Sequence, residues 1–205
     1  MNFAKMKRHL TLFSLFLTLT TTLFGQQTGE VYQIGDGNNF CAAIKTSAFQ
    51  FYQAEQEYDN WCWAACIQMV LNYQGIKISQ CDIVAKAFGQ CINRPAGCDV
   101  MVRAANGWDY NGTALEAWAE DDISSKDLID ALAFKYPVII GLNMPGQNVG
   151  HAYVLTAIFF KYDSNHNKIP YKVRLRDPWP TNPNVYETTW NDFRSRINCI
   201  VHVTH

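Results

Sequence analysis

The first two thirds of the chain carry apolar residues at helical spacing. The pattern predicts three helices, over residues 61–73, 79–88 and 124–134. Ser79 stands just before the second segment, where a hydroxyl can cap the first backbone N–H groups. Ser124 and Asp127 resemble a capping box at the start of the third. The N-terminal part of the domain is therefore expected to be largely helical.

The pattern changes near residue 136 to segments rich in Val, Ile, Tyr and Phe, which are typical of strands. These segments predict strands over residues 136–144, 152–162, 171–176 and 200–203. Polar turns at residues 146–148 and 163–167 separate the first three, so they are expected to run antiparallel. Helices followed by antiparallel strands indicate an α+β fold, with an N-terminal helical lobe packed on a C-terminal antiparallel sheet.

The remaining segments have weaker patterns. We expect an irregular lead-in with one short strand over residues 26–55, and a Gly-, Cys- and Pro-rich loop over residues 89–112. Residues 113–118 are expected to form a short helix, and residues 188–196 a late one. The acidic run 120–122 is expected to be a solvated face rather than a calcium site.

The N-terminus has the pattern of a signal peptide. Three basic residues precede an uncharged run of Leu, Phe and Thr over residues 10–24. This run of about 15 residues is short for a membrane span, which needs about 20, so a retained anchor is the less favoured alternative. We therefore expect a signal peptide at 1–25 and one domain at 26–205, secreted or periplasmic. Its 14 basic and 18 acidic residues would give a net charge of −4, with no basic cluster to favour nucleic acid.

The chain contains seven cysteines, an odd number. An exported protein is expected to form disulfides, and an odd count leaves one thiol unpaired. Cys62 is the candidate for that thiol. Six remaining cysteines allow 15 connectivities. Among them, the sequence suggests the pairs Cys91–Cys98, Cys41–Cys199 and Cys66–Cys81.

Cys62 lies at the predicted start of the helix over residues 61–73, between two tryptophans. A helix N-terminus favours the thiolate, which is the nucleophilic form of cysteine. Gln56 precedes it by six residues and could donate to a developing oxyanion beside the Cys62 backbone N–H. The alternatives are ordinary ones: a structural half-cystine for Cys62 and a solvated polar residue for Gln56.

His151 follows Gly150 at the head of a predicted strand, and Asp177 ends the next strand. An imidazole there could pair with a thiolate and later protonate a leaving amine. Asp177 could fix the tautomer of that imidazole, and Trp179 could shield their hydrogen bond from water. The alternatives are a core histidine, a turn residue in Asp177-Pro178, and simple core packing of Trp179.

The motifs Gln56, Trp61-Cys62-Trp63-Ala64-Ala65, Gly150-His151 and Asp177-Pro178 resemble those of papain-like cysteine peptidases over about residues 50–200. The likeness is to a short bacterial secreted branch that includes plant-pathogen effector proteases and is related to bacteriocin-leader-processing peptidases. It implies Cys62 as nucleophile, His151 as general base and acid, Asp177 as orienting residue, Gln56 in the oxyanion hole, and a two-lobed fold.

Three features depart from that family pattern. The interval of 89 residues between Cys62 and His151 is shorter than in plant and lysosomal papains. The third residue is Asp rather than Asn. The Cys-rich segment 81–98 has no counterpart in intracellular leader peptidases, so substrate preference does not carry over from them.

The sequence thus predicts an exported cysteine peptidase that acts on proteins or peptides through an acyl-enzyme. Two alternatives remain: a peptidoglycan cross-link hydrolase or transamidase on the same fold, and a non-enzymatic secreted binding module with Cys62 bridged. We expect a monomer without stable membrane association after signal removal. No cofactor and no metal are expected, since Cys62 and Cys66 lack zinc-site spacing and no matching His pair accompanies them.

Overall fold

The computed structural model describes residues 30–120, 122–146 and 150–205. The predicted signal peptide and most of the predicted turn at 146–148 lie outside these residues. The strands are β1 (Tyr32–Gln33), β2 (Phe40–Ala43), β3 (Asp109–Tyr110), β4 (Thr113–Ala114), β5 (Glu116–Ala119), β6 (Val138–Leu142), β7 (His151–Tyr162), β8 (Lys168–Arg176), β9 (Val185–Thr189) and β10 (Ile197–Thr204). The helices are α1 (Thr46–Phe49), which a 3-10 turn (Gln50–Tyr52) continues, α2 (Cys62–Tyr73), α3 (Gln80–Phe88), α4 (Cys98–Ala105), α5 (Ser125–Ala133) and α6 (Trp190–Arg196).

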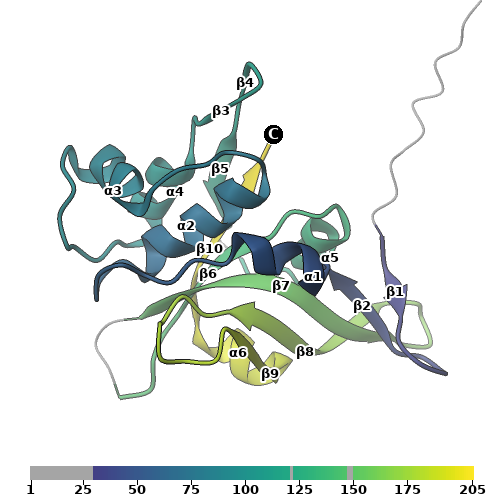
Figure 1. Ribbon diagram of the computed structural model, residues 1–205. Coiled ribbons are helices and arrows are strands. Elements are labelled where there is room, and N and C mark those ends of the chain that lie inside the picture. Colours follow the sequence, from purple (N-terminus) through teal and green to yellow (C-terminus); the bar gives the residue numbers. More distant parts are fainter. Residues whose placement is uncertain (1–29, 121, 147–149) are drawn as a thin grey trace, which may run out of the picture.

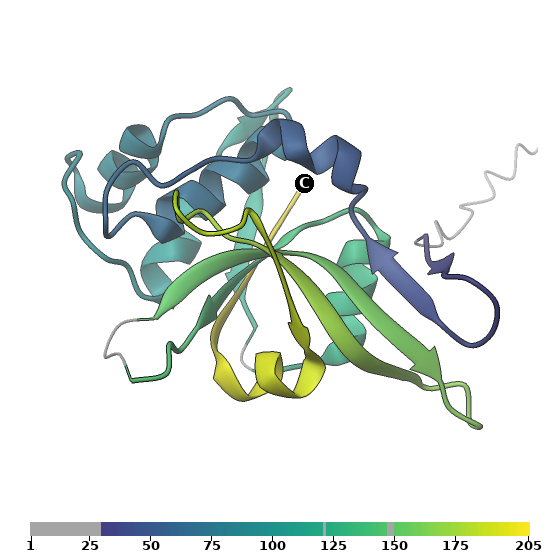
Figure 2. The ribbon, with the colours of Figure 1, turned by 60° about the horizontal axis from the view of Figure 1, so that its bottom comes forward.

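One antiparallel sheet organises the molecule, in the order β1-β2-β7-β6-β10-β5, with β8 on β7 and β9 on β8. Helices α2, α3 and α4 gather into one lobe beside it, and α6 lies on the opposite side from α2 (Figures 1 and 2). The side chains of Trp63, Ile67 and Met69 on α2 are buried in the core that joins α2 to the sheet. The predicted α+β fold with a helical lobe on an antiparallel sheet is confirmed. Within the described residues, no helix is long and apolar enough to cross a bilayer.

Local signals located three helices well. The Ser79 hydroxyl accepts the backbone N–H of Asp82 at 3.1 Å, at the start of α3. The Ser124 hydroxyl accepts the backbone N–H of Asp127 at 3.2 Å, at the start of α5. Thr189 caps α6 in the same way, so the predicted late helix is confirmed with a later start. The predicted strands match β6, β7, β8 and β10.

Two predictions between residues 89 and 119 are wrong. Part of the predicted loop is helix α4, whose buried side chains of Met101, Ala104 and Ala105 pack in the core. The glycines and cysteines of this segment lie at the ends of the helix and not within it. The composition of the segment as a whole therefore predicted a loop where there is a helix. The predicted helix at 113–118 is instead β4 and β5, because β5 pairs antiparallel with β10 along the sheet edge.

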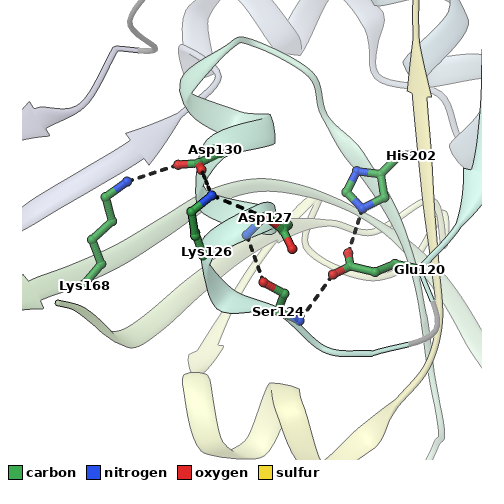
Figure 3. Close-up of polar contacts among 7 residues, drawn as sticks. All are labelled: Glu120, Ser124, Lys126, Asp127, Asp130, Lys168 and His202. Carbon is green, nitrogen blue, oxygen red and sulfur yellow. Dashed lines mark hydrogen bonds and ion pairs between the residues drawn. The ribbon is translucent and has the colours of Figure 1, made fainter.

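In the acidic run at 120–122, Asp121 lies outside the described residues, Asp122 is exposed as expected, and Glu120 is partly buried. The Glu120 carboxylate lies 2.8 Å from the ring Nε2 of His202 and accepts the backbone N–H of Ser124 at 3.3 Å (Figure 3). The ring of Trp118 stacks on His202, with centroids 5.2 Å apart. These contacts tie the end of β5 to β10 and to the start of α5. Glu120 and His202 are 82 residues apart, so no local pattern indicates this pair.

The three suggested disulfide pairs are also wrong. The described cysteines form the bridges Cys81–Cys91 and Cys98–Cys199, which leaves Cys41, Cys62 and Cys66 free. Cys66 faces the core from α2 and Cys41 lies in β2, and both are buried. The suggestion that Cys62 is free agrees with the structure, but it is one of three free thiols. The Cys98–Cys199 bridge joins α4 in the helical lobe to β10 in the sheet.

We expect removal of the Cys98–Cys199 bridge to destabilise the protein more than removal of Cys81–Cys91. The two bridges close loops with sequence separations of 101 and 10 residues. The longer loop loses more unfolded-state entropy, which corresponds to a difference of about 2 kcal/mol in the free energy of unfolding. Urea unfolding of the paired Cys→Ser variants measures this difference. Equal losses would contradict it.

Candidate active site

The start of α2 is held by the two tryptophans that flank Cys62. The indole Nε1 of Trp61 donates to the carbonyl of Ile92 at 2.9 Å, and that of Trp63 donates to the carbonyl of Arg94 at 3.1 Å. Both rings are buried. They pin the segment before α4 against the first turn of α2. Cys62 between them stays half-buried and lines a cavity.

The sheet brings His151 and Asp177 together. His151 is the first residue of β7, and Asp177 directly follows β8, its antiparallel neighbour. The His151 Nε2 lies 2.7 Å from the Asp177 Oδ1. Asp177 also accepts the backbone N–H of Trp179 at 2.9 Å and the Nδ2 of Asn182 at 2.8 Å. Burial opposes ionisation of Asp177, but these hydrogen bonds outweigh it and lower its pKa.

The Cys62 side chain lies close enough to the ring of His151 to influence its pKa. Since Nε2 faces Asp177, the Nδ1 atom is the one left for the sulfur. Burial disfavours the imidazolium, but the hydrogen bond to Asp177 and the interaction with the Cys62 side chain outweigh it and raise the pKa of His151 to about 9. Cys62 and Asp177 thus both interact with the ring of His151.

Aromatic rings border the imidazole of His151. The Tyr153 ring meets it edge-on with centroids 4.7 Å apart, and the Trp179 ring lies at 6.2 Å, also edge-on. The His151 side chain is only 12% exposed and that of Asp177 only 5%. The hydrogen bond between them is therefore largely screened from water.

The other two free thiols differ from Cys62 in their surroundings. Cys66 lies one helical turn further along α2, has no exposed surface, and burial raises its thiol pKa well above the usual range. Cys41 is 6% exposed, and burial raises its pKa to about 11. Neither lines the cavity. Cys62 is thus the free thiol that a solute can reach.

Gln56 lies near the turn that carries Asp177 but not in the cavity wall. Its backbone N–H donates to the carbonyl of Pro178 at 2.8 Å, which ties its loop to the Asp177 turn. Its side-chain Nε2 lies 3.0 Å from each of the carbonyls of Tyr58 and Asp59. The buried Oε1 has no partner among the described residues. The amide nitrogen therefore already has two acceptors in this structure.

The cavity has a volume of about 610 Å³ and takes its walls from both lobes. Its apolar side chains are contributed by Trp63, Met101, Met144 and Trp179, and its side-chain amides by Asn60, Asn182 and Asn198. Within the described ranges, no group of three or more His, Cys, Asp or Glu side chains is arranged to hold a metal ion. The sequence interpretation missed Asn182 and Asn198, because an isolated Asn in a turn or a strand carries no signal of its own.

Comparison with solved structures shows the papain-like fold. The peptidase domain of Streptococcus ComA, a bi-functional ABC transporter involved in a quorum sensing pathway, matches with a TM-score of 0.52 and 17% identity, covering 74% of this chain and 96% of that domain. The digestive procathepsin L 3 of the Tenebrio molitor larval midgut matches with a TM-score of 0.51 and 9% identity, covering 77% of this chain and 68% of that one. No curated protein matches the sequence.

A family model gives the more specific result. The model described as the Peptidase_C39 like family matches residues 47–201, which is most of the chain. That range contains Cys62, His151 and Asp177. Together with the papain-like fold, it identifies the general chemistry. The chain therefore belongs to the Peptidase_C39 like family and is a cysteine-type peptidase.

Proposed function

We propose that this protein is an exported peptidase in which Cys62, His151 and Asp177 form a catalytic triad. The observation that carries the proposal is the placement of Cys62 and His151 in one cavity, with the Asp177 carboxylate 2.7 Å from the far nitrogen of the His151 ring. This cavity is shared by the two lobes, and we expect an extended peptide to approach the Cys62 sulfur there. Family membership supports a protein or peptide as the substrate.

In the proposed reaction, the Cys62 thiolate attacks the carbonyl carbon of the scissile bond. The protonated ring of His151 then donates its Nδ1 proton to the leaving amine, and a thioester to Cys62 remains. His151 next takes a proton from water, which attacks the thioester and releases the acid product, and this restores the Cys62 thiolate and the protonated His151. Asp177 accepts from Nε2 throughout, which fixes the ring orientation and stabilises the imidazolium.

The developing oxyanion needs hydrogen-bond donors. The first N–H groups of a helix have no intrahelical acceptor, so the backbone N–H of Cys62 at the start of α2 is one proposed donor. Gln56 remains the predicted second donor. Because its Nε2 is already shared between two carbonyls, this role requires it to release one of them when substrate binds.

Trp179 is proposed to shield the hydrogen bond between His151 and Asp177. Its ring edge lies against the imidazole, and its own backbone N–H donates to the same Asp177 Oδ1. A less polar setting strengthens the interaction between imidazolium and carboxylate. The ring of Trp179 is thus proposed to exclude water, while its backbone N–H helps to orient the carboxylate.

Export is part of the proposal. The basic and apolar pattern of residues 1–25 predicts a signal peptide, and the two disulfides are compatible with an oxidising compartment. The likeness to plant-pathogen effector proteases and the monomeric state remain predictions from the sequence.

The proposed triad makes a prediction about pH. If the reactive form contains protonated His151, turnover should fall as pH rises through about 9, the raised pKa of that ring. The sign follows from the hydrogen bonds, which stabilise the charged ring and so extend activity upward in pH. A profile of kcat/KM against pH measures this. A rate that keeps rising well above that pH would contradict it.

A paired substrate assay tests the proposed function. The purified protein, freed of residues 1–25, is incubated with casein and separately with purified peptidoglycan fragments. We expect cleavage of casein that an epoxysuccinyl inhibitor abolishes through covalent attachment to Cys62. Cleavage of peptidoglycan alone would instead support the cell-wall alternative. Cleavage that persists after complete modification of Cys62 would exclude the triad.

A further inference from the structure

A β-bulge in β10 lies directly beside the active-site cavity. Ile197 of β10 pairs with Leu142 of β6, and Cys199 pairs with Gly141, the preceding residue of β6. Asn198 is therefore one extra residue opposite β6. Bulges of this kind redirect a side chain and are common next to active sites. Here the Asn198 side chain contributes to the cavity wall.

The carboxamide of Asn198 occupies space that two glycines leave open. A Cβ atom on Gly141 would lie 2.4 Å from the Asn198 Oδ1, and a Cβ atom on Gly150 would lie 2.9 Å from its Nδ2. Neither glycine has a positive φ, so their backbone conformation does not require glycine. What the glycines provide is room for this one side chain, which reaches from β10 across β6 to the residue before β7.

Two covalent or hydrogen-bonded anchors fix the position of Asn198. Its Nδ2 donates to the Asn143 Oδ1 at 2.7 Å, which sets the orientation of the amide. The next residue, Cys199, is bonded to Cys98 at the start of α4. Helix α4 packs against α2, the helix that begins with Cys62. The bulge is thus linked to both lobes.

The contact between Asn198 and Gly150 links Asn198 to the proposed catalytic residue His151. Gly150 directly precedes His151, which pairs with Leu142 at the last position of β6. Its Cβ position would also lie 2.9 Å from the Leu142 carbonyl, so the backbone there is closely packed on two sides. A shift of Gly150 into space left by a smaller residue 198 would carry the His151 ring with it.

We propose that Asn198 is a positioning residue that holds the Gly150–His151 backbone in place and thereby keeps the His151 ring in register with Cys62. The inference rests on the proposed role of His151 in the triad. It assigns Asn198 no contact with the reacting atoms. Rather, Asn198 acts by filling the gap between β10 and the start of β7.

The Asn198→Ala substitution tests this. It removes the Asn198 carboxamide. It leaves unchanged the titratable groups beside the His151 ring, which are Asp177, Cys62 and Tyr153. We expect kcat to fall about 10-fold or more, because small displacements of a catalytic group are costly, while KM changes little. The alkaline limb of the pH profile should move to lower pH, since a displaced ring loses part of its hydrogen bonding. Unchanged thermal unfolding would show that the fold is intact.

A second readout does not depend on substrate. The imidazole resonances of His151, assigned with a His151→Asn variant, are followed by NMR as a function of pH. We expect the ring to titrate at lower pH in Asn198→Ala than in the wild type. An unchanged titration and an unchanged kcat would overturn the inference even if the wild-type enzyme hydrolyses peptides through Cys62. Absence of Cys62-dependent hydrolysis in the wild type would instead overturn the proposed function.

A double-mutant cycle with Gly141→Ala completes the test. In the single Gly141→Ala variant, the new methyl group would collide with the Asn198 Oδ1 and displace the Asn198 side chain. We therefore expect a loss of kcat similar to that of Asn198→Ala. In the double variant the methyl group has room, apart from a close contact with Cys199, and the two losses should be clearly less than multiplicative. Fully multiplicative losses, or an effect confined to KM, would overturn the positioning role.

Discussion

Cys62→Ala should lower kcat by about 10⁴-fold or more, the largest effect expected of any single substitution in this protein. The variant removes the sulfur that would attack the peptide carbonyl, and no other described thiol lines the cavity. The helix start should survive, because Trp61 and Trp63 anchor it through their own hydrogen bonds. Hydrolysis of casein, with thermal unfolding as a check of the fold, measures the loss.

The matched control is Cys66→Ala. Cys66 is also a free cysteine of α2 and lies four residues further along, but it is fully buried. Its removal should reduce stability modestly by leaving a small cavity, with little change in kcat. Full activity in Cys62→Ala, or equal losses in both variants, would contradict the assignment of Cys62 as the nucleophile.

Asp177→Asn should lower kcat by about 10²-fold or more, the second largest effect expected. The amide loses the negative charge that stabilises the imidazolium of His151. Its NH₂ group would also face the Nδ2 of Asn182, which now donates to the carboxylate at 2.8 Å. Because the carboxylate raises the pKa of His151, its removal should also shift the alkaline limb of the pH profile to lower pH.

Asp130→Asn is the control for this substitution. Asp130 is an aspartate of α5 that pairs with Lys126 and Lys168 and lies outside the cavity (Figure 3). Its neutralisation should leave both kcat and the alkaline limb as in the wild type. If Asp177→Asn kept the wild-type rate and the wild-type limb, the carboxylate would have no part in catalysis.

Local signals in the sequence predicted much of the fold. Ser79 and Ser124 cap helices as expected, since a side-chain cap depends on residues only three positions apart. The segments after residue 136 form strands because their Val, Ile and aromatic side chains are buried in the sheet. The structure also places the predicted residues Cys62 and His151 in one cavity and Asp177 within hydrogen-bond distance of His151.

The predictions that were wrong or missing concern features that depend on contacts between residues distant in sequence. Residues 116–119 form a strand because β10, far along the chain, offers them an edge, and residues 113–114 pair instead with β3. The pairing of Cys98 with Cys199 follows from the packing of α4 against β10, which no spacing rule reports. Asn198 was missed for the same reason, because its proposed role depends on a bulge and on two glycines, one in β6 and one directly before β7.

The most direct test of the central claim is alkylation of the purified, non-reduced protein with iodoacetamide, followed by peptide mass spectrometry. We predict one adduct, on Cys62, because Cys41 and Cys66 are buried and burial raises the pKa of both thiols. The remaining four cysteines should be recovered as Cys81–Cys91 and Cys98–Cys199. A Cys62 that stays unmodified, or that is recovered in a disulfide, would contradict its assignment as the reactive thiol of this peptidase.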